Sequence, residues 1–257
     1  MAKYTIERLL PKFIKTKLFG ERDKYGYVPV EGDSCWVEWQ KNHHKFYEST
    51  QKNGVGKVVN DAGYQILKDI DLEGKRVLEI GPGALAHKHY WSTIPKEYVL
   101  VDIDDDFLSK AANVLSESDI KYNKVLVSRD DGFKLPFKEQ EFDIIISFFS
   151  LEHLYPIESY LSEFYRVLKN EGELVGAIPS EGGFAWGLGR YLTSRRWLLK
   201  NTTINPDKII CWEHPNFANK ILNECKKVFG NGNTKYWPLK LHVIDMNLVI
   251  KFRYKKI

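Results

Sequence analysis

Cysteine and long apolar runs are both scarce in this sequence of 257 residues. The three cysteines, Cys35, Cys211 and Cys225, are widely scattered and form no CxxC pair, which argues against a disulfide framework or a structural zinc site. No stretch reaches the roughly 18 to 20 consecutive apolar residues that a membrane span needs. We therefore expect a soluble protein of the reducing cytoplasm.

The N-terminus lacks the uninterrupted apolar segment of a secretory leader, because lysines interrupt the apolar positions of its first 20 residues. The same segment fits either a packed terminal helix or a basic amphipathic helix with weak contact to a membrane surface. Pro11 interrupts the helix in both cases.

A large excess of one charge is missing as well. The net charge of +4 and the isoelectric point near 8.7 fall short of the concentrated basic surface that indicates nucleic-acid binding. Hydrophobic residues make up 43% of the chain and charged residues 28%, which is the range of ordinary globular proteins. We expect a small-molecule partner, and the sequence does not indicate an oligomeric state.

Short apolar runs alternate with segments of helical periodicity through most of the chain. The predicted strands are residues 77–80, 98–101, 124–127, 142–147, 173–178, 236–242 and 247–254, and the predicted helices are residues 55–70, 107–115, 157–168 and 217–229. Alternating strands and helices predict parallel units with right-handed crossovers. The short connection between the last two strands allows only an antiparallel pair. The expected fold is α/β, with a doubly wound, mostly parallel sheet of about seven strands.

A glycine pair follows the first predicted strand, in the segment Val77-Leu78-Glu79-Ile80-Gly81-Pro82-Gly83. Glycine has no Cβ, so the backbone there can approach a ligand closely, beside a helix N-terminus. Asp102 ends the next strand, 19 residues after Gly83, where a carboxylate can accept both hydroxyl protons of an adenosine ribose. These two features fit NAD as well as S-adenosylmethionine.

An ordered series of motifs separates the two cofactors. The series is Glu79-x-Gly81-x-Gly83, Val101-Asp102-Ile103, Asp131-Gly132-Phe133-Lys134-Leu135-Pro136-Phe137, Phe142-Asp143-Ile144-Ile145-Ile146-Ser147, Leu151-Glu152-His153-Leu154 and Arg166-Val167-Leu168-Lys169-Asn170-Glu171-Gly172. Over about residues 55–178 it resembles the class I S-adenosylmethionine-dependent methyltransferases, specifically the small-molecule group often called type 11. The sequence departs from that pattern at Asn170-Glu171-Gly172, where the family commonly has Pro-Gly-Gly. A nicotinamide-dependent dehydrogenase becomes the weaker alternative.

The resemblance implies a Rossmann-like fold and a set of cofactor contacts. It implies that Glu79, Gly81, Pro82 and Gly83 line the methionine half of S-adenosylmethionine, that Asp102 holds the ribose, that Ile103 covers one adenine face, that Asp131 and Gly132 meet the adenine amino end, and that Phe148 follows the fourth strand into the pocket. The residues alone leave other interpretations open, because Glu79 also fits a solvent-facing carboxylate. The two aspartates also fit ordinary loop capping.

Two further segments, one at the N-terminus and one after the fifth predicted strand, are expected to complete the site. Residues 36–47 resemble the helical lid that often closes over the cofactor in this family, although their aromatic side chains fit a plain core equally well. We predict an N-terminal helical lid over residues 1–54 and a methyltransferase domain over residues 55–257. Within that domain, glycines, aromatics and basic residues at about residues 180–212 predict a substrate-specificity insertion.

Methyl transfer is an in-line displacement, so a base is needed only when the acceptor is a poor nucleophile such as an alcohol. His153, just beyond the fourth strand, is the first candidate base, and His214 is the alternative. His153 also fits a histidine that merely opens the helix predicted after it, and His214 also fits a packed loop histidine. Glu152 beside His153 resembles a metal-binding pair of some O-methyltransferases, but two adjacent residues make a poor metal site, so we predict no metal.

The acceptor is the least defined part of the prediction. Phe148 lies in Ser147-Phe148-Phe149-Ser150 and not in the Asp/Asn-Pro-Pro-aromatic loop of enzymes that act on base amines, and no Pro-Cys nucleophile is present. The insertion holds basic and aromatic residues, which are Arg190, Arg195, Arg196, Lys200, Trp186, Tyr191 and Trp197. They fit a phosphate-bearing or sugar-bearing acceptor, or a solvated basic helix. We predict O-methylation of a sugar or nucleotide-linked molecule in surface-polysaccharide biosynthesis. The alternatives are a quinol or phenol, tRNA, and a non-catalytic partner protein that only binds the cofactor.

Overall fold

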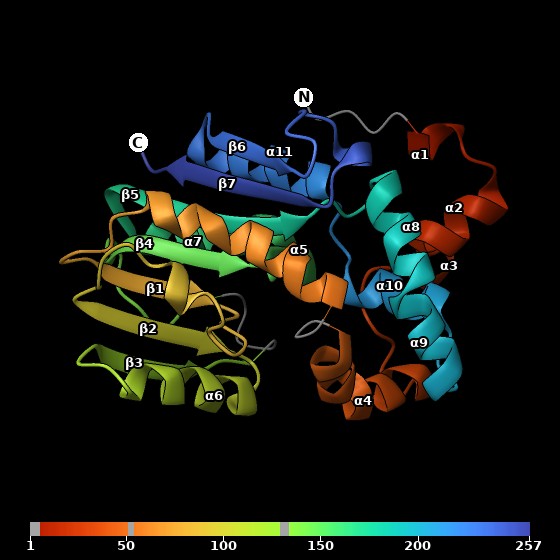
Figure 1. Cartoon of the computed structure of the whole chain (residues 1–257), viewed down its shortest axis with the longest axis horizontal. Helices are drawn as coiled ribbons and strands as arrows, with labels where there is room; N and C mark the ends of the chain where they lie inside the picture. The colour runs from red at the N-terminus through yellow and green to blue at the C-terminus, as the bar shows by residue number, and fades with distance from the viewer. Residues whose placement is uncertain (1–5, 51–53, 129–133) are drawn as a thin grey trace.

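The computed structural model describes residues 6–50, 54–128 and 134–257. Its centre is a seven-stranded sheet in the order β3-β2-β1-β4-β5-β7-β6 (Figure 1). The strands are β1 (Arg76–Ile80), β2 (Glu97–Asp102), β3 (Lys121–Leu126), β4 (Phe142–Phe148), β5 (Leu168–Pro179), β6 (Asn233–Trp237) and β7 (Val249–Lys255). Strands β1 to β5 are parallel, and β7 runs antiparallel to both β5 and β6. The predicted Rossmann-like, mostly parallel sheet is confirmed.

Helices cover both faces of this sheet because its central strands are apolar on both sides. In β4, Ile145 packs into the core beneath α7 (Ile157–Val167) and α11 (Ala218–Phe229). Its neighbours Ile144 and Ile146 face the opposite core, beneath α5 (Gly54–Tyr64), the 3₁₀ turn η1 (Gln65–Asp69) and α6 (Asp105–Ser116). The alternation follows from the two-residue repeat of a strand and gives the doubly wound arrangement.

Several predicted strands have the wrong limits. The strand predicted at residues 124–127 is β3 and that at 173–178 is β5, and both begin earlier than expected. The expected strand at residues 236–242 is β6, which ends at Trp237. Pro238 follows, and proline cannot donate a ladder hydrogen bond, so the pairing with β7 stops there. The antiparallel pairing of the last two strands is as predicted.

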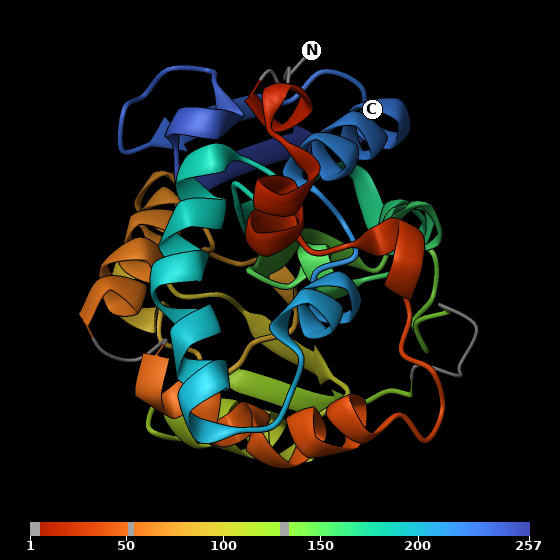
Figure 2. The same cartoon turned by 90° about the vertical axis from the view of Figure 1, so that its right-hand side faces the viewer.

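The N-terminal segment and the insertion form one helical cap. The N-terminal helices are α1 (Ile6–Leu9), α2 (Lys12–Phe19), α3 (Arg22–Tyr25) and α4 (Ser34–Thr50), and the insertion folds into α8 (Phe184–Leu192), α9 (Ser194–Asn201) and α10 (Pro206–Glu213). The parallel strands point toward these helices in Figure 1, and Figure 2 shows the helices in front of the strand ends. A separate small core joins them, in which Trp39 of α4 packs with Leu198 of α9 and Trp212 of α10.

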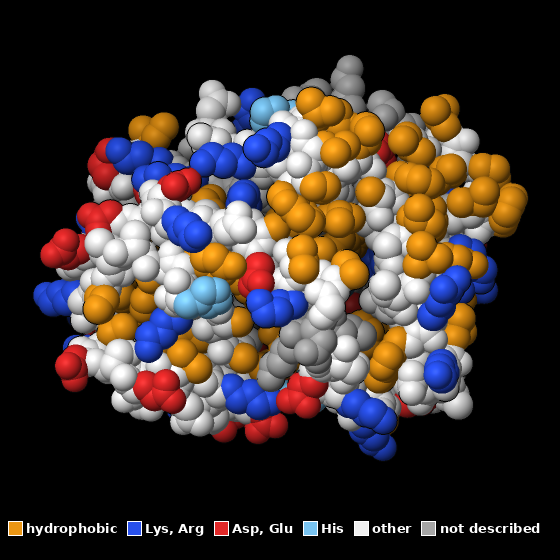
Figure 3. Space-filling model, viewed as in Figure 1, with side chains coloured by type: hydrophobic (Ala, Val, Ile, Leu, Met, Phe, Trp, Pro, Cys, Tyr) orange, Lys and Arg blue, Asp and Glu red, His pale blue; other side chains and the backbone are white. Residues whose placement is uncertain are grey.

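Exposed apolar side chains concentrate on part of the surface. In Figure 3 they gather over α5, α8 and the N-terminal helices, whereas charged side chains dominate the opposite end of the sheet. Leu9, Phe13 and Val55 are 82%, 72% and 68% exposed. Within residues 6–50, 54–128 and 134–257, no helix combines the length and the apolar character that a membrane crossing requires. Contact of the N-terminus with a membrane surface stays a prediction.

Candidate active site

The loop after β1 adopts a conformation that requires glycine. Gly81 and Gly83 have φ values of 69° and 53°, in the left-handed region that other residues rarely adopt. A Cβ on Gly81 would lie 2.7 Å from Cβ of Ser150, and one on Gly83 would lie 3.2 Å from the hydroxyl of Tyr47 on α4. The loop therefore presents backbone without side chains at the end of β1, close to α4.

Glu79 is fully buried at the end of β1, and its carboxylate accepts two hydrogen bonds. The Tyr98 hydroxyl donates to Oε2 at 2.8 Å, and Nε2 of His87 lies 2.6 Å from Oε1. The indole N–H of Trp91 donates to Nδ1 of His87 at 3.2 Å, so the proton of that ring is on Nε2 and points at Glu79. The interpretation of Glu79 as a solvent-facing carboxylate was wrong. His87 was missed because a lone histidine in a loop carries no sequence signal.

Asp102 ends β2 beside the glycine loop, since β1 and β2 are parallel and their carboxyl ends share one edge of the sheet. Burial raises the pKa of Asp102 to about 6, although hydrogen bonds from the backbone N–H groups of Asp104 and Ile103 oppose the shift. Ile103 is 49% exposed and lines the cavity described below. Two predicted contacts, Asp131 and Gly132, lie outside the described residues.

A single large cavity connects the glycine loop with the cap. Its volume is about 1240 Å³, which exceeds the roughly 300–1,000 Å³ of typical ligand sites and leaves room for a cofactor and an acceptor together. Pro82 and Phe148 line it with the other predicted contacts of the described chain. The Phe148 ring packs at 5.0 Å from the His87 ring and 5.1 Å from the Tyr64 ring. Lid aromatics, including Trp39 and Tyr47, form the opposite wall.

These features fit S-adenosylmethionine. The glycine loop leaves no room for Cβ atoms where a ligand must approach the backbone, and Asp102 supplies a carboxylate at the position for ribose hydroxyls. Carboxylates and aromatic rings also suit a sulfonium cation. Gly81, Gly83, Asp102 and Phe148 are therefore the described residues that would hold this cofactor.

The two candidate bases lie together at the cap end of the cavity, with their rings 4.7 Å apart. Nδ1 of His153 lies 3.3 Å from Oε2 of Glu213, and the indole N–H of Trp39 donates to the other carboxylate oxygen. Burial disfavours the imidazolium, but the hydrogen bond to Glu213 and the nearby carboxylates outweigh it and raise the pKa of His153 to about 9. His153 is thus protonated at neutral pH and is the poorer base of the two.

The pKa of His214 is shifted in the opposite direction to that of His153. Its Nδ1 lies 2.7 Å from Oε2 of the fully buried Glu181, which also accepts from Arg190 at 2.7 Å and from Trp186 at 2.9 Å. Nδ1 donates to this carboxylate, so Nε2 is the nitrogen that carries the lone pair when the ring is neutral. Burial lowers the pKa of His214 despite the opposing effect of Glu181. His214 is therefore a neutral imidazole at pH 7, which reverses the order of the two predicted bases.

Glu152 adds an unusual acid to the same wall. It is 2% exposed, and burial raises its pKa to about 7 against the opposing charge of His153. Its Oε2 has no hydrogen-bond partner among the described residues. A buried polar atom without a partner costs about 1–3 kcal/mol, so this oxygen is available to a ligand in the cavity.

The basic residues of the insertion do not form a free cationic surface in the cavity. Arg190 is paired with Glu181, and Arg195 is paired with Asp207. Arg196 and Lys200 are exposed and do not line the cavity. The arginines that reach the cavity thus have carboxylate partners already.

Comparisons with known proteins agree with this geometry. Residues 78–176 match the family model described as a methyltransferase domain. The chain is 31% identical over 143 residues to the mitochondrial arginine-hydroxylase NDUFAF5 of Mus musculus, covering 56% of this chain and 38% of that protein. It is 35% identical over 105 residues to the ubiquinone/menaquinone biosynthesis C-methyltransferase UbiE of Ectopseudomonas mendocina, covering 40% of this chain and 41% of that protein. The chain thus spans about two fifths of the length of these relatives.

Solved structures show the same fold at low identity. A SAM-dependent methyltransferase of Aquifex aeolicus superposes with a TM-score of 0.52 at 14% identity, covering 83% of this chain and 98% of that chain. A protein of Pyrococcus horikoshii gives a TM-score of 0.55 at 18% identity, covering 84% and 99%. The match to a methyltransferase domain over residues 78–176, together with this fold and the glycine loop, supports a class I S-adenosylmethionine-dependent methyltransferase domain in that part of the chain.

Proposed function

We propose that the protein transfers a methyl group from S-adenosylmethionine to a hydroxyl group of a small molecule. The observation that carries the proposal is the His214–Glu181 pair, a neutral imidazole anchored by a buried carboxylate in the same cavity as the glycine loop. An alcohol or phenol is a weak nucleophile until it loses its proton, and a fixed imidazole is the usual group that takes it.

The chain's own residues divide the work. When bound, the cofactor supplies an electrophilic methyl group on a positively charged sulfur. Gly81, Gly83 and Asp102 hold it at the sheet edge. At the cap end, Nε2 of His214 takes the hydroxyl proton, and Glu181 stabilises the imidazolium through Nδ1. Glu152 orients the acceptor by a hydrogen bond, since its Oε2 has no partner among the described residues.

The lining favours an uncharged acceptor with a flat or partly apolar body. Aromatic side chains of the cap suit the faces of a sugar or a phenol, and the paired arginines offer no free cation for a phosphate. We therefore keep the sugar hydroxyl as our first candidate, with a role in surface-polysaccharide biosynthesis, and no longer assign phosphate recognition to Arg190 and Arg195. The similarity to UbiE, a ubiquinone/menaquinone biosynthesis C-methyltransferase, supports a phenol or quinol as the alternative acceptor class.

Transfer of a labelled methyl group tests the proposal. The protein is incubated with labelled S-adenosylmethionine and, separately, a methyl glycoside, UDP-glucose, catechol or unmodified tRNA. We expect transfer to an oxygen of the glycoside or of catechol, and weaker or no transfer to UDP-glucose, whose diphosphate has no free cation from the paired arginines. Transfer to tRNA alone would contradict the small-molecule acceptor, and cofactor binding without any transfer would favour a non-catalytic partner protein.

His214→Asn tests the base with the acceptor so identified. The asparagine amide can keep the donor to Glu181 but has no Nε2, so kcat should fall about 100-fold or more while cofactor affinity stays unchanged. In the wild type, kcat/KM should fall as pH decreases through the lowered pKa of His214, and the variant should lose this acid limb. His89→Gln, at an exposed histidine that does not line the cavity, is the matched control.

A further inference from the structure

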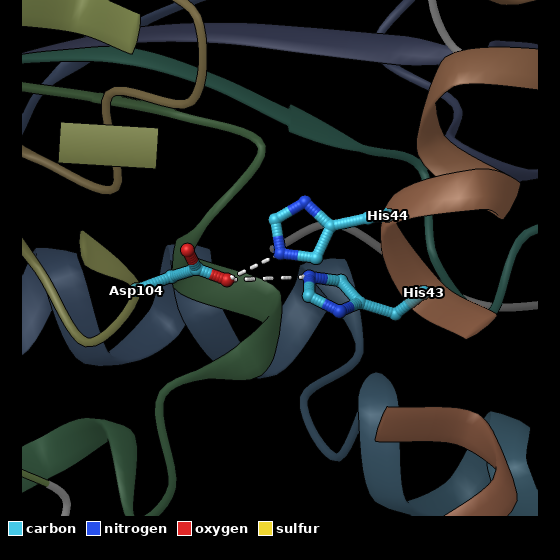
Figure 4. A group of neighbouring side chains, drawn as sticks. All are labelled: His43, His44 and Asp104. Atoms are coloured by element: carbon cyan, nitrogen blue, oxygen red, sulfur yellow. Dashed lines mark hydrogen bonds and ion pairs between the residues drawn. The ribbon is translucent and has the colours of Figure 1, made fainter. Parts of the chain in front are cut away.

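Three potential metal ligands meet where the lid approaches the sheet. His43 and His44 project from α4, and Asp104 lies in the turn between β2 and α6 (Figure 4). Nε2 of His44 lies 2.8 Å from Oδ2 of Asp104, and Nε2 of His43 lies 3.7 Å from the same oxygen. All three ligand atoms lie within 4.8 Å of one another, and all three residues line the cavity.

Neighbouring contacts hold this trio in place. The other carboxylate oxygen of Asp104 accepts the N–H groups of Asp106 and Phe107 at 3.0 and 3.2 Å, which caps α6 and leaves Oδ2 facing the imidazoles. The Phe107 ring stacks on His44 at 4.8 Å and meets the edge of His43 at 5.8 Å. Adjacent residues of a helix usually point about 100° apart, so the convergence of two rings on one oxygen is a specific arrangement.

We propose that His43, His44 and Asp104 bind one divalent transition-metal ion, with zinc as the best fit. Two imidazole nitrogens and one carboxylate oxygen are a common zinc set, whereas magnesium and calcium prefer oxygen ligands. Tetrahedral zinc bonds of about 2.0–2.1 Å place ligand atoms about 3.3 Å apart. The two separations from Oδ2 of Asp104, 2.8 and 3.7 Å, lie on either side of that value, and the two imidazole nitrogens lie within 4.8 Å of each other, so binding requires shifts of at most about 1.5 Å.

The ion would join two segments that both border the cofactor end. Asp104 lies two residues after Asp102, and Tyr47, one turn after His43 and His44, reaches the glycine loop at Gly83. Because two ligands come from α4 and the third from the turn after β2, the ion would hold α4 against the edge of the sheet. The fourth coordination position faces the cavity and would take water or a ligand atom.

Cobalt binding to the untagged, chelator-treated full chain tests the proposal. Cobalt(II) reports coordination by visible absorption bands, and zinc should displace it. We expect one saturable site per chain in the wild type and at least about tenfold weaker binding in His43→Gln, His44→Gln and Asp104→Asn. Asp104→Asn keeps the oxygen that caps α6, so it removes the ligand with little change to the helix. His89→Gln, which leaves the trio intact, should bind like the wild type.

A second measurement separates a metal site from a plain ion pair. The affinity for S-adenosylhomocysteine is measured by calorimetry with and without zinc. We expect zinc to tighten it severalfold in the wild type and not in Asp104→Asn. Absence of saturable cobalt binding to the wild type, or equal binding in the three variants, would overturn the proposal and leave His44 and Asp104 as an ion pair that latches the lid.

Discussion

Replacing Asp102 with asparagine should change stability and cofactor affinity in opposite directions. Burial raises the pKa of this carboxyl from 3.8 to about 6, which corresponds to about 3 kcal/mol against its ionised form in the free protein. This destabilisation of the folded chain by the ionised carboxyl is complete above about pH 6. It is absent below about pH 4, where the carboxyl is protonated in both the folded and the unfolded chain. At pH 7.5 we therefore expect Asp102→Asn to raise the free energy of unfolding by about 1–3 kcal/mol.

The same change should weaken binding of S-adenosylhomocysteine. A carboxylate that accepts two ribose hydroxyl protons makes charge-assisted hydrogen bonds worth about 1.5–3 kcal/mol each, and asparagine keeps one oxygen. We expect Kd to rise about 10- to 100-fold. In the wild type, protonation of Asp102 should also raise Kd about tenfold between pH 7 and pH 5, since a pKa of about 6 leaves about a tenth of the carboxyl ionised at pH 5.

Calorimetric titration at pH 5, 6, 7 and 8, with urea unfolding at pH 7.5, measures both effects. Asp102→Asn removes this titrating carboxyl, so the part of the pH dependence that is due to Asp102 should disappear in the variant. The matched control is Asp106→Asn, at an exposed aspartate of the same helix start. Equal pH dependence in wild type and variant, or unchanged affinity, would refute the assignment of Asp102 to the ribose.

Two further substitutions test other parts of the site. Gly81→Ala should lower the free energy of unfolding by about 2–4 kcal/mol, because alanine at φ 69° is strained and its Cβ would lie 2.7 Å from Cβ of Ser150. A decrease below about 1 kcal/mol in urea unfolding would contradict the loop geometry. Glu213→Gln removes the charged partner of His153. Because the His153 side chain is 35% exposed and solvent screens the pair, we expect the free energy of unfolding at pH 6 to fall by only about 1–2 kcal/mol. The raised pKa of His153 stabilises the fold fully below pH 6.5, and this contribution is lost as pH rises through about 9, so the difference should shrink at pH 10.

The sheet was predictable because its signals are local. Apolar runs such as Val77 to Ile80 and Phe142 to Ser147 are strands in the structure, and their alternation with helices allows few topologies. The glycine loop was also legible, since Gly81 and Gly83 occupy the left-handed conformations that glycine favours. The end of β6 was missed because the apolar pattern continued past Pro238.

The protonation of the site was not predictable, because it depends on partners that are distant in sequence. His153 and His214 were both candidates, but their order depends on Glu213 and Glu181, which reach them only after α10 and the cap have folded. The same holds for the arginines of the insertion. A basic segment fits a free cationic surface until Asp207 and Glu181 are found beside its side chains.

The charge pattern of the cavity separates two kinds of ligand. At the glycine-loop end, Glu79 and Asp102 both accept hydrogen bonds. Glu79 accepts from Nε2 of His87, and Nδ1 of the same ring accepts from the indole N–H of Trp91. Carboxylates without a paired cation favour a positively charged ligand. At the cap end, the carboxylates of Glu181 and Glu213 each have a cation beside them already. A charged group of a ligand bound there would therefore have no partner of opposite charge. A sulfonium at one end and an uncharged hydroxyl compound at the other therefore suit the charges of the two ends, and loss of the sulfonium charge on methyl transfer weakens the hold on the spent cofactor.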